Sequence, residues 1–209
     1  MTRRFLVVGH TQSTRSDVPL DDITGKGGRI DVLARAVTAA LCLSHGLRTD
    51  TEVWCVIDHP GVAAGPRTLR FDGAALRSFN PDERSTAALF RKAFAVDVVP
   101  NGHFEAAHPG VDAALLGLSA AFDRCASMGP WILLDRDAPP LDHALDALPR
   151  GRGVGFIVSD HQPFTVDERA MFAAGGARPA SLGTAWLQGN AAVILAHAAL
   201  DRRAPAPSP

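Results

Sequence analysis

The 209-residue sequence has no apolar run long enough to cross a bilayer, and Met1-Thr2-Arg3-Arg4 leads directly into apolar residues 5–8 rather than into a signal-peptide core. We therefore expect no membrane span and a cytoplasmic protein. A strong charge of either sign is also missing, since 21 basic and 22 acidic residues give a formal net charge of -1. This balance, with 46% hydrophobic residues, excludes a disordered chain and an indiscriminate polyanion binder.

Cysteine and lysine are scarce as well. The three cysteines, Cys42, Cys55 and Cys125, are widely spaced in apolar surroundings and form no C-x-x-C pair, so we interpret them as reduced core residues. The histidines of residues 103–108 are five positions apart, which favours a solvated loop over a metal site, and we expect no metal. Arginine accounts for 19 of the 21 basic residues, which is compatible with a genomic bias or with phosphate binding.

Short, nearly continuous apolar runs alternate with helical segments, a pattern typical of an α/β domain with a largely parallel sheet. The expected strands are residues 5–8, 53–57, 68–71, 131–134 and 155–158. No linker divides the chain, so we expect one domain over residues 1–201, followed by a flexible, proline-rich tail at 202–209.

Helices are expected between these strands. Their ranges are 29–44, 80–94, 111–125 and 190–200, with a short helical piece between the prolines at 139–140 and 149. The first helix has apolar residues at helical spacing and should stop at His45-Gly46. The second should begin with Asn80 as N-cap, Pro81 at the first helical position and Glu83 completing a capping box.

Three familiar nucleotide-binding and hydrolase signatures are absent. The stretch ending in Gly25-Lys26 has Leu20 where a P-loop needs its first glycine. The glycines at 151 and 153 precede a strand instead of following one, so a dinucleotide site of the Rossmann type is unsupported. No G-x-S-x-G motif is present, so a nucleophile elbow is also excluded.

A polar loop follows the first expected strand and ends in a cluster of glycines. The strand stops at Gly9-His10, and Gly25, Gly27 and Gly28 stand just before the first helix. Such glycines can leave backbone N–H groups free to face an anion. The alternative is a flexible turn before an amphipathic helix, which the residues alone favour.

Several stretches of the chain resemble one known family. They are Gly9-His10 with residues 25–35, residues 43–50 and 79–89, and, near the C-terminus, residues 156–161, 180–183 and 197–201. In these stretches the chain resembles the archaeal tRNA pseudouridine N1-methyltransferases, which belong to the SPOUT class. The resemblance covers most of the chain and is weakest over residues 95–130.

The resemblance implies a fold, an activity and an assembly. The implied fold is an α/β SPOUT fold with a parallel sheet, helices on both faces and a C-terminal deep trefoil knot, in a protein that works as a homodimer. The implied activity is methyl transfer from S-adenosylmethionine to N1 of a pseudouridine in RNA, in archaea at position 54 of the tRNA T-loop.

The resemblance also implies where S-adenosylmethionine binds, namely in the knot, at three loops that follow strands. The implied cofactor-binding residues are Leu134, Val158, Ser159, Asp160, Ser181, Leu182, Gly183, Leu187 and Asn190. The chain departs from the family pattern there, since Ser159 replaces a glycine, Thr184 a proline and Ala191-Ala192 a His-Cys pair. These departures and the modest charge leave two alternatives open. One is a methyltransferase for a free pseudouridine-like nucleoside or another small molecule, and the other is an RNA-binding protein without activity.

Methyl transfer to pseudouridine needs a proton acceptor, because N1 carries a proton that must leave before its lone pair can attack. Asp31 as the base and Arg29 as a cation near the ring, both beside the glycine cluster, are the expected catalytic residues. The structural alternative is that Asp31 favours the helix dipole and pairs with Arg35 four residues later.

The expected RNA-binding residues lie on the second helix. Arg84 and Arg91 are seven positions apart, hence on one helical face, and Asp82 precedes them. Residues 67–92 contain six basic and three acidic residues, a local excess of positive charge that the near-neutral total conceals. A small arginine-built site for one structured RNA loop is therefore expected, with an ordinary solvated face as the alternative.

Overall fold

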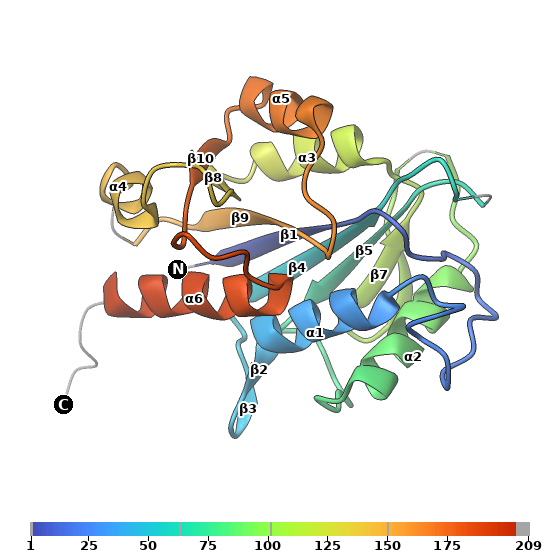
Figure 1. Cartoon of the computed structure of the whole chain (residues 1–209). Helices are drawn as coiled ribbons and strands as arrows, with labels where there is room; N and C mark the ends of the chain where they lie inside the picture. Colours follow the sequence, from blue (N-terminus) through green and yellow to red (C-terminus); the bar gives the residue numbers. More distant parts are fainter. Residues whose placement is uncertain (1, 63, 101, 150, 204–209) are drawn as a thin grey trace.

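The computed structural model of the protein describes residues 2–62, 64–100, 102–149 and 151–203, which fold around one eight-stranded sheet (Figure 1). The strand order is β10-β8-β9-β1-β4-β5-β7-β6. The parallel strands are β1 (Arg3–Gly9), β4 (Thr51–Ile57), β8 (Trp131–Leu134), β9 (Val154–Ser159) and β10 (Arg178–Ala180). Three antiparallel strands extend the sheet beyond β4, namely β5 (Arg67–Asp72), β7 (Val111–Ala114) and β6 (Glu105–His108). The predicted α/β class with a largely parallel sheet is confirmed.

Helices cover both faces of the sheet, as predicted (Figure 1). One face carries α1 (Ile30–Leu41), α2 (Glu83–Phe94) and α6 (Gly189–Arg203), and the other carries α3 (Leu118–Ala126) and α5 (Val166–Ala174). The short helix α4 (Leu141–Asp146) packs into the same core as α1 and α6. Within the described ranges, no helix is both long and apolar enough to span a membrane.

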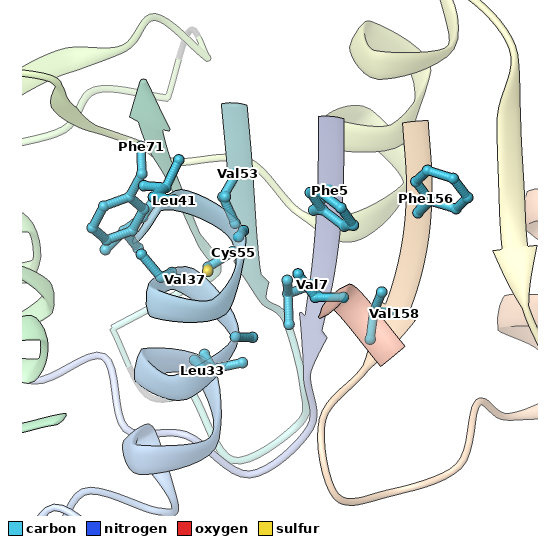
Figure 2. Packing of buried hydrophobic residues seen from close by; sticks show 14 of the residues in the cluster. Phe5, Val7, Leu33, Val37, Leu41, Val53, Cys55, Phe71, Phe156 and Val158 are labelled. Atoms are coloured by element: carbon cyan, nitrogen blue, oxygen red, sulfur yellow. The ribbon is translucent and has the colours of Figure 1, made fainter. Parts of the chain in front are cut away.

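The core has two halves, one on each side of the sheet. Phe5 and Val7 of β1 lie on the side of the sheet that carries α1 and α6, in one buried cluster with Leu33 and residues of the neighbouring strands (Figure 2). The alternate residues, Leu6 and Val8, pack on the opposite side against α3 and α5. Because helices cover both faces of the sheet, the central strands are continuously apolar in sequence. Such runs predict buried strands, and the predicted positions of the central strands are confirmed.

The first helix is shorter than predicted. It ends at Leu41 instead of residue 44, because Cys42 and Leu43 form strand β2 (Cys42–Leu43), which pairs with β3 (Gly46–Leu47) in a small hairpin. The expected stop signal at His45-Gly46 therefore belongs to the turn of this hairpin and to β3. Cys42 is half-buried, whereas Cys55 and Cys125 are buried, and all three cysteines are free.

The start of the second helix also differs from the prediction. Asp82, not Asn80, is the N-cap, and its carboxylate accepts a hydrogen bond from the backbone N–H of Ser85 at 2.8 Å. The predicted capping box is wrong, since Glu83 is already the first helical residue and instead pairs with Arg35 of α1 at 3.3 Å. Asp82 is the N-cap because its carboxylate reaches the backbone N–H of Ser85, three residues later.

Two further predictions fail where the sheet extends beyond β5. Residues 111–114 form β7 rather than the start of a helix, since Val111 pairs with Phe71 across the strands, and α3 begins only at Leu118. The stretch predicted as a solvated loop contains edge strand β6 (Glu105–His108). Both errors have one cause, namely pairing with strands far away in the sequence, which local spacing does not report.

The C-terminal helix is longer than predicted. It continues through Arg202 and Arg203, which the sequence predicts to lie in the flexible tail, and Arg203 pairs with Asp146 of α4 at 2.6 Å. The remaining tail residues, 204–209, lie outside the described residues.

Candidate active site

A cavity of about 480 Å³ opens at the carboxyl ends of β8, β9 and β10. Three loops line it, with residues 134–136 following β8, residues 158–164 following β9 and residues 182–189 following β10. Carboxyl ends of parallel strands meet at one edge of a sheet, which is the usual ligand position in open α/β folds. The volume suits a small organic ligand.

Most of the residues predicted to bind the cofactor come together here. The lining includes Leu134, Val158, Ser159, Asp160, Leu182, Gly183 and Leu187. Ser181 and Asn190 are not among the lining residues. The Ser181 hydroxyl instead bonds to the backbone O and N–H of Gly183, at 2.9 and 3.1 Å, and so shapes the loop from behind. Asn190 lies one residue beyond the lining residue Gly189.

The structure adds lining residues that the sequence did not single out. Trp186 is 63% exposed, and the Arg136 guanidinium lies 4.3 Å from the centre of its ring. Arg169 of α5 pairs with Asp135 at 2.7 Å. For Trp186, the sequence does contain a signal of a binding residue. A large aromatic side chain in a glycine-containing loop belongs to no helical or strand pattern, so core packing does not explain it.

The cavity can hold a ligand that combines an apolar ring system with a charged end. Val158, Phe164 and Leu187 supply apolar surface. The cationic side chains of the wall are Arg136 and Arg169, each of which is paired with an aspartate, Asp137 and Asp135 respectively. Gly189 permits the close approach of the loops, because a Cβ there would lie 2.9 Å from the backbone oxygen of Ser159.

Asp160 is the most heavily bonded residue of this wall. Its carboxylate accepts hydrogen bonds from the His10 backbone N–H at 2.9 Å, from His10 Nδ1 at 2.9 Å, from Gln12 Nε2 at 3.0 Å and from the Gln162 N–H at 2.8 Å. Burial opposes ionisation, but the bonds from His10, Gln162 and Gln12 outweigh it and lower the pKa of Asp160. Because both of its oxygens accept hydrogen bonds, Asp160 is ionised and holds residues 158–164 against the end of β1.

The glycine cluster forms a fixed turn, not the flexible one considered above. Gly28 has a φ of 60°, and a Cβ there would lie 2.2 Å from the Thr11 carbonyl oxygen. Arg29, at the N-cap of α1, is also left-handed, with a φ of 70°. Gln12 Nε2 donates to the Arg29 carbonyl at 3.3 Å and also to Asp160, so this turn is joined to the wall of the cavity.

The backbone of this turn does not provide an anion site, which was the less favoured of the two alternatives for the glycine cluster. Its N–H groups from Gly25 to Ile30 all have partners within the turn. Asp22 alone accepts three of these bonds, two on its carboxylate from Gly25 and Lys26 and one on its carbonyl from Gly27. These donors are therefore not free, because Asp22 accepts three of the bonds and the carbonyls of residues 23–25 accept the other three.

Asp31 lies beside the turn and is paired with two arginines. Arg29 donates to both of its oxygens, at 3.0 and 3.2 Å, and Arg35 pairs with it at 2.8 Å. Asp31 is 1% exposed, whereas the Arg29 side chain is 41% exposed. The Asp31–Arg35 pair expected as the structural alternative is therefore present, together with a second pair that holds Arg29 at the surface.

The predicted RNA-binding residues belong to α2, with Asp82 as its N-cap, and this helix contacts α1 through the Arg35–Glu83 pair. Arg84 and Arg91 are exposed. The Asp82 carboxylate is engaged in capping, and the bond from Ser85 lowers its pKa. In the part of the chain that the structure describes, no group of three or more His, Cys, Asp or Glu residues is arranged to hold a metal ion.

Comparisons with known proteins match residues 2–204 to the family described as "Putative SAM-dependent RNA methyltransferase". The tRNA (pseudouridine(54)-N(1))-methyltransferase of Haloferax volcanii is 38% identical over 200 residues, which cover 95% of this chain and 96% of that protein. The enzyme of the same name from Natronomonas pharaonis is 39% identical over 201 residues, again covering 95% and 96%.

The fold is shared with a solved structure. The crystal structure of Archaeoglobus fulgidus Nep1 bound to S-adenosylhomocysteine matches with a TM-score of 0.63 over 97% of this chain and 98% of that one. The two sequences are 12% identical, so this likeness concerns the arrangement of the sheet and helices.

Proposed function

The chain belongs to the SAM-dependent RNA methyltransferase family, and from this we propose that it methylates N1 of a pseudouridine in tRNA, at position 54 of the T-loop. The observation that carries the proposal is the 38% identity to a tRNA pseudouridine methyltransferase over 95% of the chain. A tRNA substrate also implies that the protein acts in the cytoplasm.

The cavity fits S-adenosylmethionine. Its apolar residues suit the adenine ring, and Arg136 and Arg169 are the cations that could contact a carboxylate, in exchange for or beside their present partners Asp137 and Asp135. Gly189 keeps the loops close enough to enclose a ligand. We propose that the seven lining residues predicted above hold the cofactor, and that Ser181 and Asn190 support their loops from outside the cavity.

When bound, S-adenosylmethionine supplies the methyl group, which N1 attacks as the carbon–sulfur bond breaks and the N1 proton leaves. The residues of the chain contribute a positive charge, that of Arg29, which is held in position before the reaction. Asp31 holds Arg29 beside the cavity wall, where the guanidinium can stabilise negative charge that develops on the pseudouridine ring. Asp31 uses three of the roughly four acceptor positions of its carboxylate for Arg29 and Arg35. Its role as base would need the remaining position, so it is distinct from its role as holder of Arg29.

The RNA is proposed to lie across the end of the molecule that carries this turn. Arg84 and Arg91 of α2 would contact phosphates. The pair between Glu83 of α2 and Arg35 of α1 connects this helix to the one that begins after Arg29. Trp186 lines the cavity and is 63% exposed, and Arg136 lies over its ring, so the other face of the indole offers a surface on which an unpaired base can stack.

The proposed function is tested by a methylation assay on three substrates, namely T-loop RNA with pseudouridine, the same RNA with uridine, and free pseudouridine. We expect methylation of the pseudouridine RNA alone. Methylation of the free nucleoside alone would show a small-molecule enzyme. Calorimetry with S-adenosylmethionine completes the test, since absence of binding at high cofactor concentration would indicate a protein without methyltransferase activity.

We also infer that the protein is a homodimer. Two apolar side chains of α6 face solvent, since Ile194 is 53% and Leu195 is 41% exposed, and Leu187 just before the helix is 38% exposed. Neighbouring exposed apolar residues mark an interaction surface more often than isolated ones do. A self-complementary contact through α6 would cover them in a two-fold dimer.

Replacing Ile194 with glutamate is expected to convert the dimer to a monomer, because a charge would be buried in the contact. Light scattering coupled to gel filtration measures the mass. The matched control is Leu43→Glu, since Leu43 is also exposed, at 50%, but lies on the β2–β3 hairpin. A dimer that persists in Ile194→Glu and is lost in Leu43→Glu would move the interface to the hairpin.

The C-terminal trefoil knot implied by the family stays part of this proposal. Two contacts support it, because they hold the segment between β10 and α6 in place among earlier loops. Ser181 donates from its N–H to the Pro139 carbonyl at 2.7 Å and accepts from Leu141 at 2.8 Å, while Gly189 lies against Ser159.

A further inference from the structure

His10 lies at the carboxyl end of β1 between two carboxylates. Its Nδ1 is 2.9 Å from Asp160 Oδ1, and its Nε2 is 3.1 Å from Glu168 Oε1. The side chain is only 14% exposed. Sequence spacing gave no role to this histidine, since its partners are 150 and 158 residues away.

The two contacts fix the protonation of His10. An ionised carboxylate can only accept hydrogen bonds, so both ring nitrogens must donate, and a histidine that donates from both is the imidazolium. Burial acts against this charge, but the bonds and charges of Asp160 and Glu168 outweigh it and raise the pKa of His10 above 6.5. The other charged or titratable groups at this point are Arg29, whose charge interacts with Asp160, and His161, whose Nδ1 is 3.4 Å from Asp160 Oδ2.

The partners of His10 belong to different parts of the proposed active site. Asp160 lies in the loop of residues 158–164 that lines the cavity, which we call the cofactor loop. Glu168 lies in the first turn of α5, where its other oxygen accepts from the Thr165 N–H at 2.7 Å and completes a capping box. Through Asp160 and Gln12, the same network reaches the carbonyl of Arg29.

We propose that His10, as the imidazolium, is a positioning residue that holds the cofactor loop and the start of α5 in register with the turn that carries Arg29. The inference rests on the proposed function in taking the cavity as the S-adenosylmethionine site. His10 does not line the cavity, so it acts through Asp160 and Glu168.

Loss of one proton from His10 would disturb both contacts. A neutral imidazole has one N–H and one lone pair, so a lone pair would face one of the two carboxylates. That carboxylate would lose its donor in a mostly buried position, and the cofactor loop would lose one of its attachments. The affinity for S-adenosylmethionine should therefore fall as the pH rises through the pKa of His10.

The test measures S-adenosylmethionine binding by calorimetry over a range of pH, with no need for turnover. For the wild type, we expect affinity to decrease on the alkaline side. The His10→Asn variant should bind about tenfold to hundredfold more weakly at acid and neutral pH and should lose the pH dependence, because asparagine can serve Asp160 but cannot carry charge or reach Glu168. His45→Asn, which changes an exposed histidine on the β2–β3 hairpin, should retain the wild-type profile.

A second variant keeps His10 and its fold intact. Glu168→Gln preserves the capping box, for which glutamine is suited, but removes one negative charge from His10. It should shift the midpoint of the pH profile downward by about one pH unit. This variant decides the question even where His10→Asn fails to fold.

The proposal is overturned if His10→Asn lowers only the thermal unfolding temperature while affinity and its pH profile stay as in the wild type. An unshifted midpoint in Glu168→Gln would overturn it equally. A wild-type protein that binds the cofactor with the expected pH dependence but does not methylate pseudouridine RNA would contradict the proposed function and leave this inference supported.

Discussion

The Asp31→Asn variant is expected to lose about 100-fold in kcat/KM on pseudouridine T-loop RNA while it binds S-adenosylmethionine as the wild type does. Asp31 accepts hydrogen bonds from Arg29 on both oxygens and from Arg35 on one. Asparagine has one acceptor oxygen and an NH2 group that can only donate, so Arg29 loses its bidentate contact and one guanidinium N–H faces a donor. Single-turnover rates and calorimetry measure the two quantities separately.

A double-mutant cycle distinguishes the two roles of Asp31. If Asp31 acts by holding Arg29, then adding Arg29→Lys to Asp31→Asn should cost little beyond the slower single variant. If Asp31 is the base, the two losses should multiply. Asp146→Asn breaks a surface pair with Arg203 and is the matched control for removing a carboxylate from an arginine. A wild-type rate in Asp31→Asn would remove Asp31 from both roles.

The second large effect concerns stability in acid and arises at His197 of α6. This residue is 3% exposed, its Nδ1 accepts from Arg3 Nη1 at 3.1 Å, and its Nε2 donates to the Ala40 carbonyl at 3.0 Å. Since arginine can only donate, the ring must be neutral. Burial, followed by the charges of Arg48 and Arg3, lowers the pKa of His197 from 6.5 to about 4.

The folded protein therefore takes up this proton less readily than the unfolded chain. The stabilisation from the neutral ring is complete above pH 6.5 and is lost as the pH falls toward 4, by up to about 3 kcal/mol. In urea unfolding, the wild type should thus lose more stability between neutral pH and pH 4 than His197→Gln, whose amide keeps one acceptor and one donor without titrating. Equal losses would show that His197 does not control acid stability. His10 acts in the opposite direction, since its raised pKa gives stability that is lost as the pH rises.

The buried parts of the fold could be predicted from the sequence because their signals are local. The strand at 131–134 was placed correctly, since Trp131, Ile132 and Leu133 are buried by helices on both faces of the sheet. Helix α5 was missed because Phe172 is its only buried residue, so it has no apolar stripe to detect. Strand β10 has three residues, two of them exposed, and forms only by pairing with β8.

The site could be predicted in part, and mainly through resemblance to a family. Seven of the nine proposed cofactor residues line the cavity. The contacts that organise the cavity remained hidden, because the Asp160 carboxylate meets His10 and Gln12 across about 150 residues of sequence. Likewise, the spacing of Gly25, Gly27 and Gly28 correctly indicated a special backbone, but whether its donors were free depended on Asp22.

The left-handed backbone at Arg29 has a consequence for which residues can occupy position 29. An L-residue with a side chain costs about 1 kcal/mol or more in that conformation, and glycine would occupy it without strain. The backbone alone therefore favours glycine, whereas the buried carboxylate of Asp31 requires a donor from this position. Glycine at position 29 would relax the backbone and leave Asp31 with Arg35 as its remaining ion-pair partner among the described residues. The turn thus trades backbone strain for a fixed guanidinium.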